Sequence, residues 1–194
     1  MIQWSYADCV TFSRSRDEFG SLSNRASYPI ILGHLRVPTI EHLYQALRFS
    51  HAPSLQQDIF ALPHPLLAKR YAYRHRAATR SDWEEVKSDM MFWCLELKYV
   101  QHPDTFGQLL LATDHRKIVE ASRDDYWGAK PVANGDQPPA ILRGWNVLGR
   151  LWMLMRRKIE INSPFDLRSA VIEIPNFRLL GIDAIELAIS ERTV

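Results

Sequence analysis

The chain has 194 residues, which is enough for one domain with a small appendage. Hydrophobic residues make up 46% and charged residues 24%, so the chain can build a single core without added cross-links. The formal net charge of +2 excludes a protein that binds polyanions with its whole surface, although local basic clusters are compatible with it.

The first half of the chain predicts strands and turns followed by helices. A short strand is expected over 28–32, where apolar residues follow a turn-rich patch. Pro38-Thr39 then begins a helix that Thr39 can cap, because Ile40, Leu43, Tyr44 and Leu47 recur at helical spacing. Three more helices are expected over 66–76, from the capping-box pattern at 81–84 onward, and over 104–111.

The second half predicts fewer regular elements. Residues 117–122 fit a strand or the end of a helix, and the pattern does not separate the two. Residues 129–142 contain three prolines and an Asn-Gly pair, which predicts the longest loop of the chain. Asn146 is expected to cap a final amphipathic helix that ends near Ile159, with arginines on its polar side. Short β segments are expected over 170–174 and 178–182.

Cysteine usage and hydropathy predict a cytoplasmic location. Cys9 and Cys94 are far apart and match no metal or redox spacing, which is typical of a reducing compartment. The N-terminus lacks the apolar stretch of a signal peptide, and no apolar run reaches transmembrane length. The seven histidines show no metal-ligand spacing, and neither a glycine-rich phosphate loop nor a G-x-S-x-G motif is present, so we expect no metal and no cofactor.

Glu41 is the most prominent candidate for a catalytic carboxylate. It is expected in the first turn of a helix that is otherwise mostly apolar and aromatic. Acidic residues are favoured in first turns by the helix dipole, so a surface glutamate is the simpler interpretation of this position. Tyr44 and Gln45 can both hold a ligand, which keeps the catalytic interpretation open.

A second carboxylate is expected in the loop that ends in Trp127 and Gly128. Asp124 could present its carboxylate beside the Trp127 ring, but a turn aspartate that bonds its own backbone is a common alternative. Asp125 competes for the same role. Two carboxylates with an aromatic ring such as Trp83 suit glycosyl hydrolysis, because the transition state carries positive charge on the sugar.

Basic residues gather ahead of Trp83, at Lys69, Arg70, Arg74, Arg76 and Arg80. Such a run is usually a solvated helix face, and the alternative is a phosphate or pyrophosphate clamp. Lys69 is the favoured member of a clamp, because it lies nearest the proline-flanked start of its helix.

Short motifs in a fixed order resemble one known family. They are Phe19-Gly20-x-Leu22-Ser23-Asn24, Tyr28-Pro29-Ile30, Pro38-Thr39-x-Glu41-His42-x-Tyr44-Gln45-Ala46, Pro65-x-x-Ala68-Lys69, Trp83-x-x-x-Lys87 with Met90, Leu111-Ala112-Thr113, Asp124-x-x-Trp127-Gly128 and Gly144-x-Asn146-x-Leu148-Gly149. This succession, over about residues 10–158, is similar to the NADAR family.

The resemblance implies a compact, mainly α fold with a small β component (α+β), made of a NADAR domain over 1–160 and a β-rich extension over 161–194 packed on it. It also implies a metal-free N-glycosidase with Glu41 as main catalytic residue, Asp124 as supporting carboxylate and Trp83 as stacking residue. The pocket or phosphate contacts that it implies are Asn24, Lys69 and Asn146. Further substrate contacts are Tyr44, Gln45, Lys87, Trp127 and Gly128.

Two substrate classes follow from the resemblance: ribosylamino-pyrimidine phosphates of riboflavin metabolism, and ADP-ribose attached to guanine in nucleic acid. We slightly favour the ADP-ribosyl class, because the basic cluster and the 129–143 loop offer surface for a large ligand. Asp114 and Ala129 stand where the family has glycine, and the tail is additional, so substrate identity is the least transferable part. The rivals are a non-catalytic ADP-ribose or nucleotide-binding module, and an accessory protein whose tail adds a strand to a partner.

Overall fold

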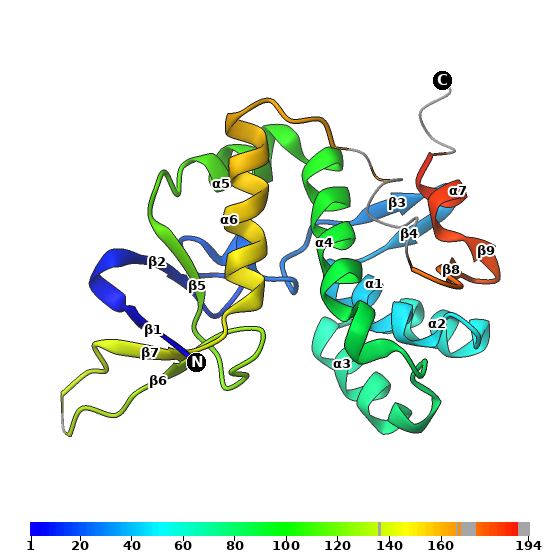
Figure 1. Cartoon of the computed structure of the whole chain (residues 1–194). Helices are drawn as coiled ribbons and strands as arrows, with labels where there is room; N and C mark the ends of the chain where they lie inside the picture. Colours follow the sequence, from blue (N-terminus) through cyan, green and yellow to red (C-terminus); the bar gives the residue numbers. More distant parts are fainter. Residues whose placement is uncertain (136, 166, 168–173, 190–194) are drawn as a thin grey trace. The chain divides into compact units, whose positions relative to one another are not determined.

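The computed structural model describes residues 1–135, 137–165, 167 and 174–189 (Figure 1). These residues form two compact units, one built from 1–26 and 102–164 and the other from 27–101 and the C-terminal segment from 165 on. Both units combine helices with small sheets, which confirms the predicted α+β class. No helix in the described part of the chain is long and apolar enough to cross a membrane.

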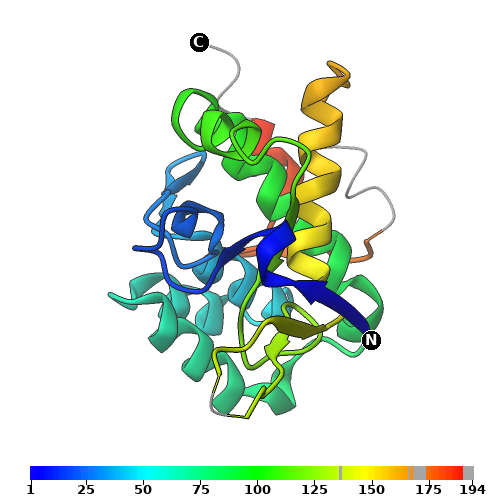
Figure 2. The same ribbon diagram turned by 90° about the vertical axis from the view of Figure 1, so that its left-hand side faces the viewer.

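The first unit holds two small sheets and one long helix. Its strands are β1 (Ile2–Ser5), β2 (Cys9–Phe12), β5 (Lys117–Glu120), β6 (Lys130–Pro131) and β7 (Ile141–Gly144). Its α-helices are α5 (Gln108–Leu111), which follows a helical turn at Pro103–Gly107, and α6 (Val147–Glu160). The order β1-β7-β6 is antiparallel, whereas β2 and β5 pair in parallel, and α6 packs along β5 (Figure 2).

The strands resolve one open prediction and correct another. Residues 117–120 form a strand, because Ile118 and Val119 are fully buried and pair with β2. The predicted loop over 129–142 is wrong at both of its ends, since Lys130 and Pro131 pair with Arg143 and Leu142 of β7. Pro131 is tolerated there because β6 is an edge strand, where one missing N–H costs no ladder bond.

Helix α6 starts at the predicted place but not by the predicted cap. Asn146 precedes the helix with φ of 51°, and its side chain makes no capping hydrogen bond. Its Nδ2 instead donates to the Ile118 carbonyl at 2.8 Å, and its Oδ1 accepts from the Glu120 N–H at 3.1 Å. The side chain therefore ties the start of α6 to strand β5.

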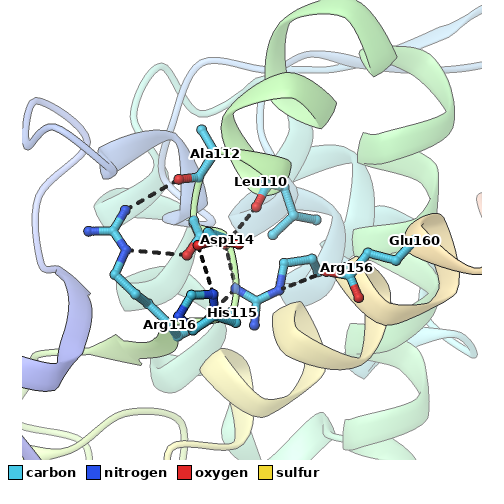
Figure 3. Close-up of polar contacts among 8 residues, drawn as sticks. Leu110, Ala112, Asp114, His115, Arg116, Arg156 and Glu160 are labelled. Carbon is cyan, nitrogen blue, oxygen red and sulfur yellow. Dashed lines mark hydrogen bonds and ion pairs between the residues drawn. The ribbon is translucent and has the colours of Figure 1, made fainter.

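The polar side of α6 was predicted to be exposed, and at Arg156 this is wrong. Arg156 is buried because its Nη1 donates to Thr113 Oγ1 at 2.6 Å and to the Arg116 carbonyl at 2.9 Å. Glu160 lies one turn further along α6, with an oxygen 3.8 Å from Arg156 Nε (Figure 3). Hydrogen-bond partners distant in the sequence therefore hold Arg156 in a buried position, although the helix pattern places it on the polar side.

The second unit is mainly helical. Its α-helices are α1 (Ile40–Ala46), α2 (Pro53–Ala61), α3 (Pro65–Arg74), α4 (Trp83–Gln101) and α7 (Ala184–Ile189). Its strands form two hairpins, β3 (Ile30–Leu32) with β4 (Leu35–Val37) and β8 (Arg178–Leu179) with β9 (Ile182–Asp183). The sequence predicted α1, α3, α4 and the β8–β9 segment, but it missed α2 and α7. Residues 170–173 of the other predicted β segment lie outside the described residues.

Helix α1 is buried on every side. Thr39 caps it as predicted, because its hydroxyl accepts from the His42 N–H. All seven residues of α1 are buried, since the helix contacts α2, α3 and α4. The acidic residue in the first turn of α1 is therefore an interior residue and not a surface one.

The C-terminal hairpin is joined to the helices by one buried glutamine. Gln56 of α2 is fully buried, and its Nε2 donates to the carbonyls of Ala46 and Arg178 at 3.2 and 3.0 Å. Its Oε1 accepts from the Leu180 N–H at 2.6 Å. Leu180 and Gly181 have positive φ values, which the tight β8–β9 turn requires.

The buried His42 predicts a pH dependence of stability. Its Nδ1 contacts Thr39 Oγ1 at 2.8 Å and its Nε2 contacts the Leu62 carbonyl at 3.1 Å. Burial lowers the pKa of His42, so the native state holds it neutral while the unfolded chain binds a proton below about pH 6.5. The free energy of unfolding should therefore fall as pH drops from that value through the lowered pKa, by at most about 1.4 kcal/mol per pH unit.

Urea unfolding of wild type and His42→Gln at about pH 7 and about pH 5.5 tests this dependence. The wild type should lose more stability than the variant between the two conditions, because glutamine takes up no proton. Equal losses in the two proteins would show that other groups cause the acid sensitivity.

Candidate active site

The predicted site residues divide between the two units. The helical unit carries Glu41, Tyr44, Gln45, Lys69, Trp83 and Lys87. The other unit carries Asn24, Asp124, Trp127, Gly128 and Asn146. Among the described residues, no group of three His, Cys, Asp or Glu side chains is arranged to hold a metal ion.

Glu41 is a shielded carboxylate in a fixed position. Only 8% of the residue is exposed, in the first turn of α1, so the interpretation as a surface glutamate is wrong. One turn along the helix, Gln45 Nε2 donates to Glu41 Oε1 at 2.9 Å. The Gln45 Oε1 is buried and has no hydrogen-bond partner among the described residues. The pair therefore offers a held carboxylate beside an acceptor that can still receive a hydrogen bond.

Cys94 of α4 belongs to the surroundings of Glu41. Burial raises the pKa of the Cys94 thiol well above its ordinary value, and the negative charge of Glu41 adds to the effect. A neutral, fully buried thiol is a poor nucleophile. Cys94 is therefore a packing residue, and the catalytic role of Glu41 stays a prediction.

Trp83 contacts two side chains of the helical unit, Tyr44 and Arg48. It is buried, and its ring centroid lies 5.1 Å from that of Tyr44 with 48° between the planes. The Arg48 guanidinium lies 4.4 Å from the Trp83 ring centroid, which is cation–π geometry. The helical spacing predicts that Glu41, Gln45 and Arg48 share one face, but Arg48 was assigned no role in the site. Its position seven residues after Glu41 and four after Tyr44 was the available signal.

A row of aromatic and cationic side chains continues from Trp83 to α3. Arg48 also lies 5.3 Å from the Tyr73 ring centroid, and Lys69 Nζ lies 5.8 Å from it. Tyr73 and Lys69 both border an open pocket of about 780 Å³. The lining residues are His64, Leu66, Leu67, Lys69, Arg70, Tyr73 and Arg74. We call it the basic α3 pocket because Lys69, Arg70 and Arg74 line it beside apolar side chains, and the phosphate clamp stays a prediction.

Two basic residues near Trp83 have partners within the protein. Arg80 is buried and forms a bidentate pair with Asp82, at 2.5 Å from Nε and 2.8 Å from Nη2, so the interpretation as a solvated helix face is wrong for this residue. The pairing also lowers the pKa of Asp82. Lys87 makes an ion pair with Glu84 one turn earlier in α4. Its role in substrate binding stays a prediction.

In the other unit, Asp124 builds the turn that carries Trp127. Its Oδ1 accepts from the backbone N–H groups of Tyr126 and Trp127, each at 3.0 Å. Asp125 bonds Lys130 Nζ at 2.6 Å, and this contact lowers the pKa of Asp125. Both carboxylates therefore have local structural partners, and the catalytic role of Asp124 stays a prediction.

Close packing explains the glycine that follows Trp127. A Cβ atom on Gly128 would lie 2.5 Å from both the Glu120 carbonyl and Ser122 Oγ, closer than atoms can approach. The Gly128 carbonyl accepts from the Asn146 N–H at 2.9 Å, so these two predicted residues are neighbours. Asn24 is mostly buried in the same unit, with 8% exposed. Gly128 is thus required by the backbone, whatever it contacts in a substrate.

Comparisons with known proteins find a matching family model, curated relatives and a similar solved structure. The NADAR domain family model matches residues 11–160. The chain is 33% identical over 155 residues to N-glycosidase YbiA of Escherichia coli strain K12, covering 79% of this chain and 90% of that protein. It is 30% identical over 165 residues to the riboflavin biosynthesis protein PYRR, chloroplastic, of Zea mays, covering 77% of this chain and 25% of that protein. The NMR structure of E. coli YbiA superposes with a TM-score of 0.65 at 32% identity, over 80% of this chain and 88% of that one.

Proposed function

Because the chain belongs to the NADAR family, it is an N-glycosidase that acts on a ribosyl compound, and we propose that Glu41 is the carboxylate that supports the hydrolysis. The observation that carries this proposal is the burial of Glu41 in the first turn of α1, with Gln45 Nε2 bonded to one oxygen. A carboxylate largely removed from water stabilises nearby positive charge more strongly than an exposed one.

The reaction breaks the C–N bond between the ribose and its base. The bonding electrons leave with the base, positive charge develops on the sugar, and water adds to the anomeric carbon. Glu41 stabilises that charge and accepts a proton from the attacking water. Gln45 holds Glu41 in orientation, and its buried Oε1 can accept a hydrogen bond from the water or a ribose hydroxyl.

The remaining predicted residues receive binding roles. Trp83 packs against the leaving base, and Tyr44 supports its ring. Asp124 is the supporting carboxylate. The further contacts are Asn24, Lys69, Lys87, Trp127, Gly128 and Asn146. We place the NADAR domain at 1–160 and the extension at 161–194, and we propose a cytoplasmic location.

Among ribosyl substrates we favour an ADP-ribosyl group, such as ADP-ribose on guanine of a nucleic acid. The support is the row from Trp83 through Arg48 to Tyr73, which leads to the basic α3 pocket. A pyrophosphate and a second base need cationic and aromatic groups beyond the cleaved bond. The relatives named as riboflavin biosynthesis proteins support the ribosylamino-pyrimidine phosphate instead, but the chain spans only 25% and 40% of two of them.

Mass-spectrometric product analysis tests the activity and the substrate class together. Wild type and Glu41→Gln are each incubated with an ADP-ribosylated guanine oligonucleotide and with a ribosylamino-pyrimidine phosphate. We expect wild type alone to release ADP-ribose from the oligonucleotide. Release from the pyrimidine phosphate alone would reverse the substrate preference. Binding without any release would favour the alternative, a non-catalytic ADP-ribose or nucleotide-binding module.

A further inference from the structure

A second pocket in the helical unit is lined by none of the predicted active-site residues. It is open, has a volume of about 600 Å³, and every lining side chain is polar. The lining residues are Ser50, His51, Thr79, Arg80, Ser81, Asp82, Asn176 and Arg178. This volume lies within the usual range of small-molecule sites. Asn176 and Arg178 lie beyond the family match over 11–160, so the C-terminal extension supplies part of the wall.

One side of this pocket is a rigid, neutral ion pair. Arg80 is 7% exposed, and Asp82 engages its Nε and Nη2. Arg80 Nη2 also donates to the Pro175 carbonyl, which fixes the extension against this wall. The charges of Arg80 and Asp82 cancel. The pair therefore forms part of the pocket wall, and any net charge of the pocket comes from other residues.

The net charge comes from Arg178. Its side chain is exposed and has no ion-pair partner among the described residues, while its carbonyl is held by Gln56 at 3.0 Å. The neighbouring Leu180 N–H is bonded to the same glutamine at 2.6 Å. A cation on an anchored backbone segment loses less conformational freedom on binding than one on a loose tail.

Thr79, which lines the pocket, carries an unused hydroxyl. Thr79 Oγ1 is buried and has no hydrogen-bond partner among the described residues. Leaving a buried polar atom unbonded is unfavourable, so such atoms usually mark a place where a water or ligand binds. His51, Ser81 and Asn176 add further donors on the same lining.

We propose that this pocket binds the phosphate group of a small metabolite or free phosphate, with Arg178 as ionic partner and Thr79 Oγ1 as a hydrogen-bond donor. Several hydroxyl, amide and imidazole donors around one guanidinium suit the multiple oxygens of a phosphate better than a single-point anion. The site is an addition to the family domain, since Arg178 belongs to the extension.

Amide chemical-shift titration of the full chain tests this proposal. The probes are inorganic phosphate, ribose 5-phosphate and, as the uncharged comparison, ribose. Both phosphates, or ribose 5-phosphate alone, should shift the amides of Thr79, Ser81 and Asn176 saturably, and ribose should not. A response to ribose 5-phosphate alone identifies the metabolite as the source of the phosphate group.

The variants distinguish a specific phosphate site from nonspecific attraction of anions to surface arginines. Arg178→Gln should weaken the binding at least about tenfold, and Thr79→Val should weaken it to a smaller extent. The matched control is Arg36→Gln, which removes an exposed arginine of the same unit that does not line the pocket and should change nothing. Absent shifts, or equal weakening in Arg36→Gln, would overturn the proposal. Glu41→Gln should keep this binding, so failed hydrolysis and failed phosphate binding are distinguishable.

Discussion

Replacing Glu41 by glutamine is expected to lower kcat for N-glycoside hydrolysis by about 10³-fold while substrate binding changes little. Glutamine has nearly the same shape but carries no negative charge, so it neither stabilises a cationic sugar nor accepts a proton from water. Because Gln45 can still donate to the oxygen of the new side chain, the fold of α1 should be kept. Single-turnover kinetics and a separate ligand-binding titration would measure the two effects.

Glu85→Gln is the matched control for this experiment. Glu85 also lies in the first turn of a helix, α4, but it is exposed. The control should retain kcat, because helix-dipole interactions alone contribute about 0.3–1 kcal/mol to stability and nothing to bond cleavage. Activity of Glu41→Gln within tenfold of wild type would contradict the proposal and would make Asp124 the next carboxylate to replace.

Replacing Asn146 by alanine is expected to lower the free energy of unfolding by about 3 kcal/mol. The change leaves the Ile118 carbonyl and the Glu120 N–H unbonded in the interior, at about 1–3 kcal/mol each, although part is recovered if water enters. The residue is fully buried, so the neighbouring packing is lost as well. Urea unfolding followed by circular dichroism would measure the loss.

Asn146→Gly separates the hydrogen bonds from the backbone conformation. The φ of 51° is strained for alanine by about 1 kcal/mol but not for glycine, so the glycine variant should be the more stable of the two. If both variants keep the stability of wild type and raise KM instead, Asn146 serves mainly as a substrate contact.

The sequence predicted the elements whose signals are local. The α1 cap at Thr39 and the apolar spacing after it were sufficient to place that helix, and the structure confirms both. Whether Glu41 lies on the surface could not be read from that spacing. Its burial depends on α2, α3 and α4, which surround α1 only in the folded chain.

The errors follow the same division between local and distant interactions. Arg80, in the turn before α4, and Arg156, in α6, look like surface residues from their local sequence. Each is buried and donates to a carbonyl far away in the chain. The 129–142 segment lacks periodicity because β6, the strand that pairs with β7 there, is only two residues long. The contact of Arg48 with Trp83 was not predicted because Trp83 lies 35 positions later in the sequence.

The Gln56 contacts have a consequence for the history of this protein. The glutamine satisfies the Arg178 carbonyl and the Leu180 N–H with one side chain, so neither the hairpin nor the glutamine is well accommodated without the other. In a relative that lacks the extension, the same glutamine would keep only its hydrogen bond to the Ala46 carbonyl. Glutamine at this position and the β8–β9 hairpin should therefore have been gained and lost together as lineages diverged.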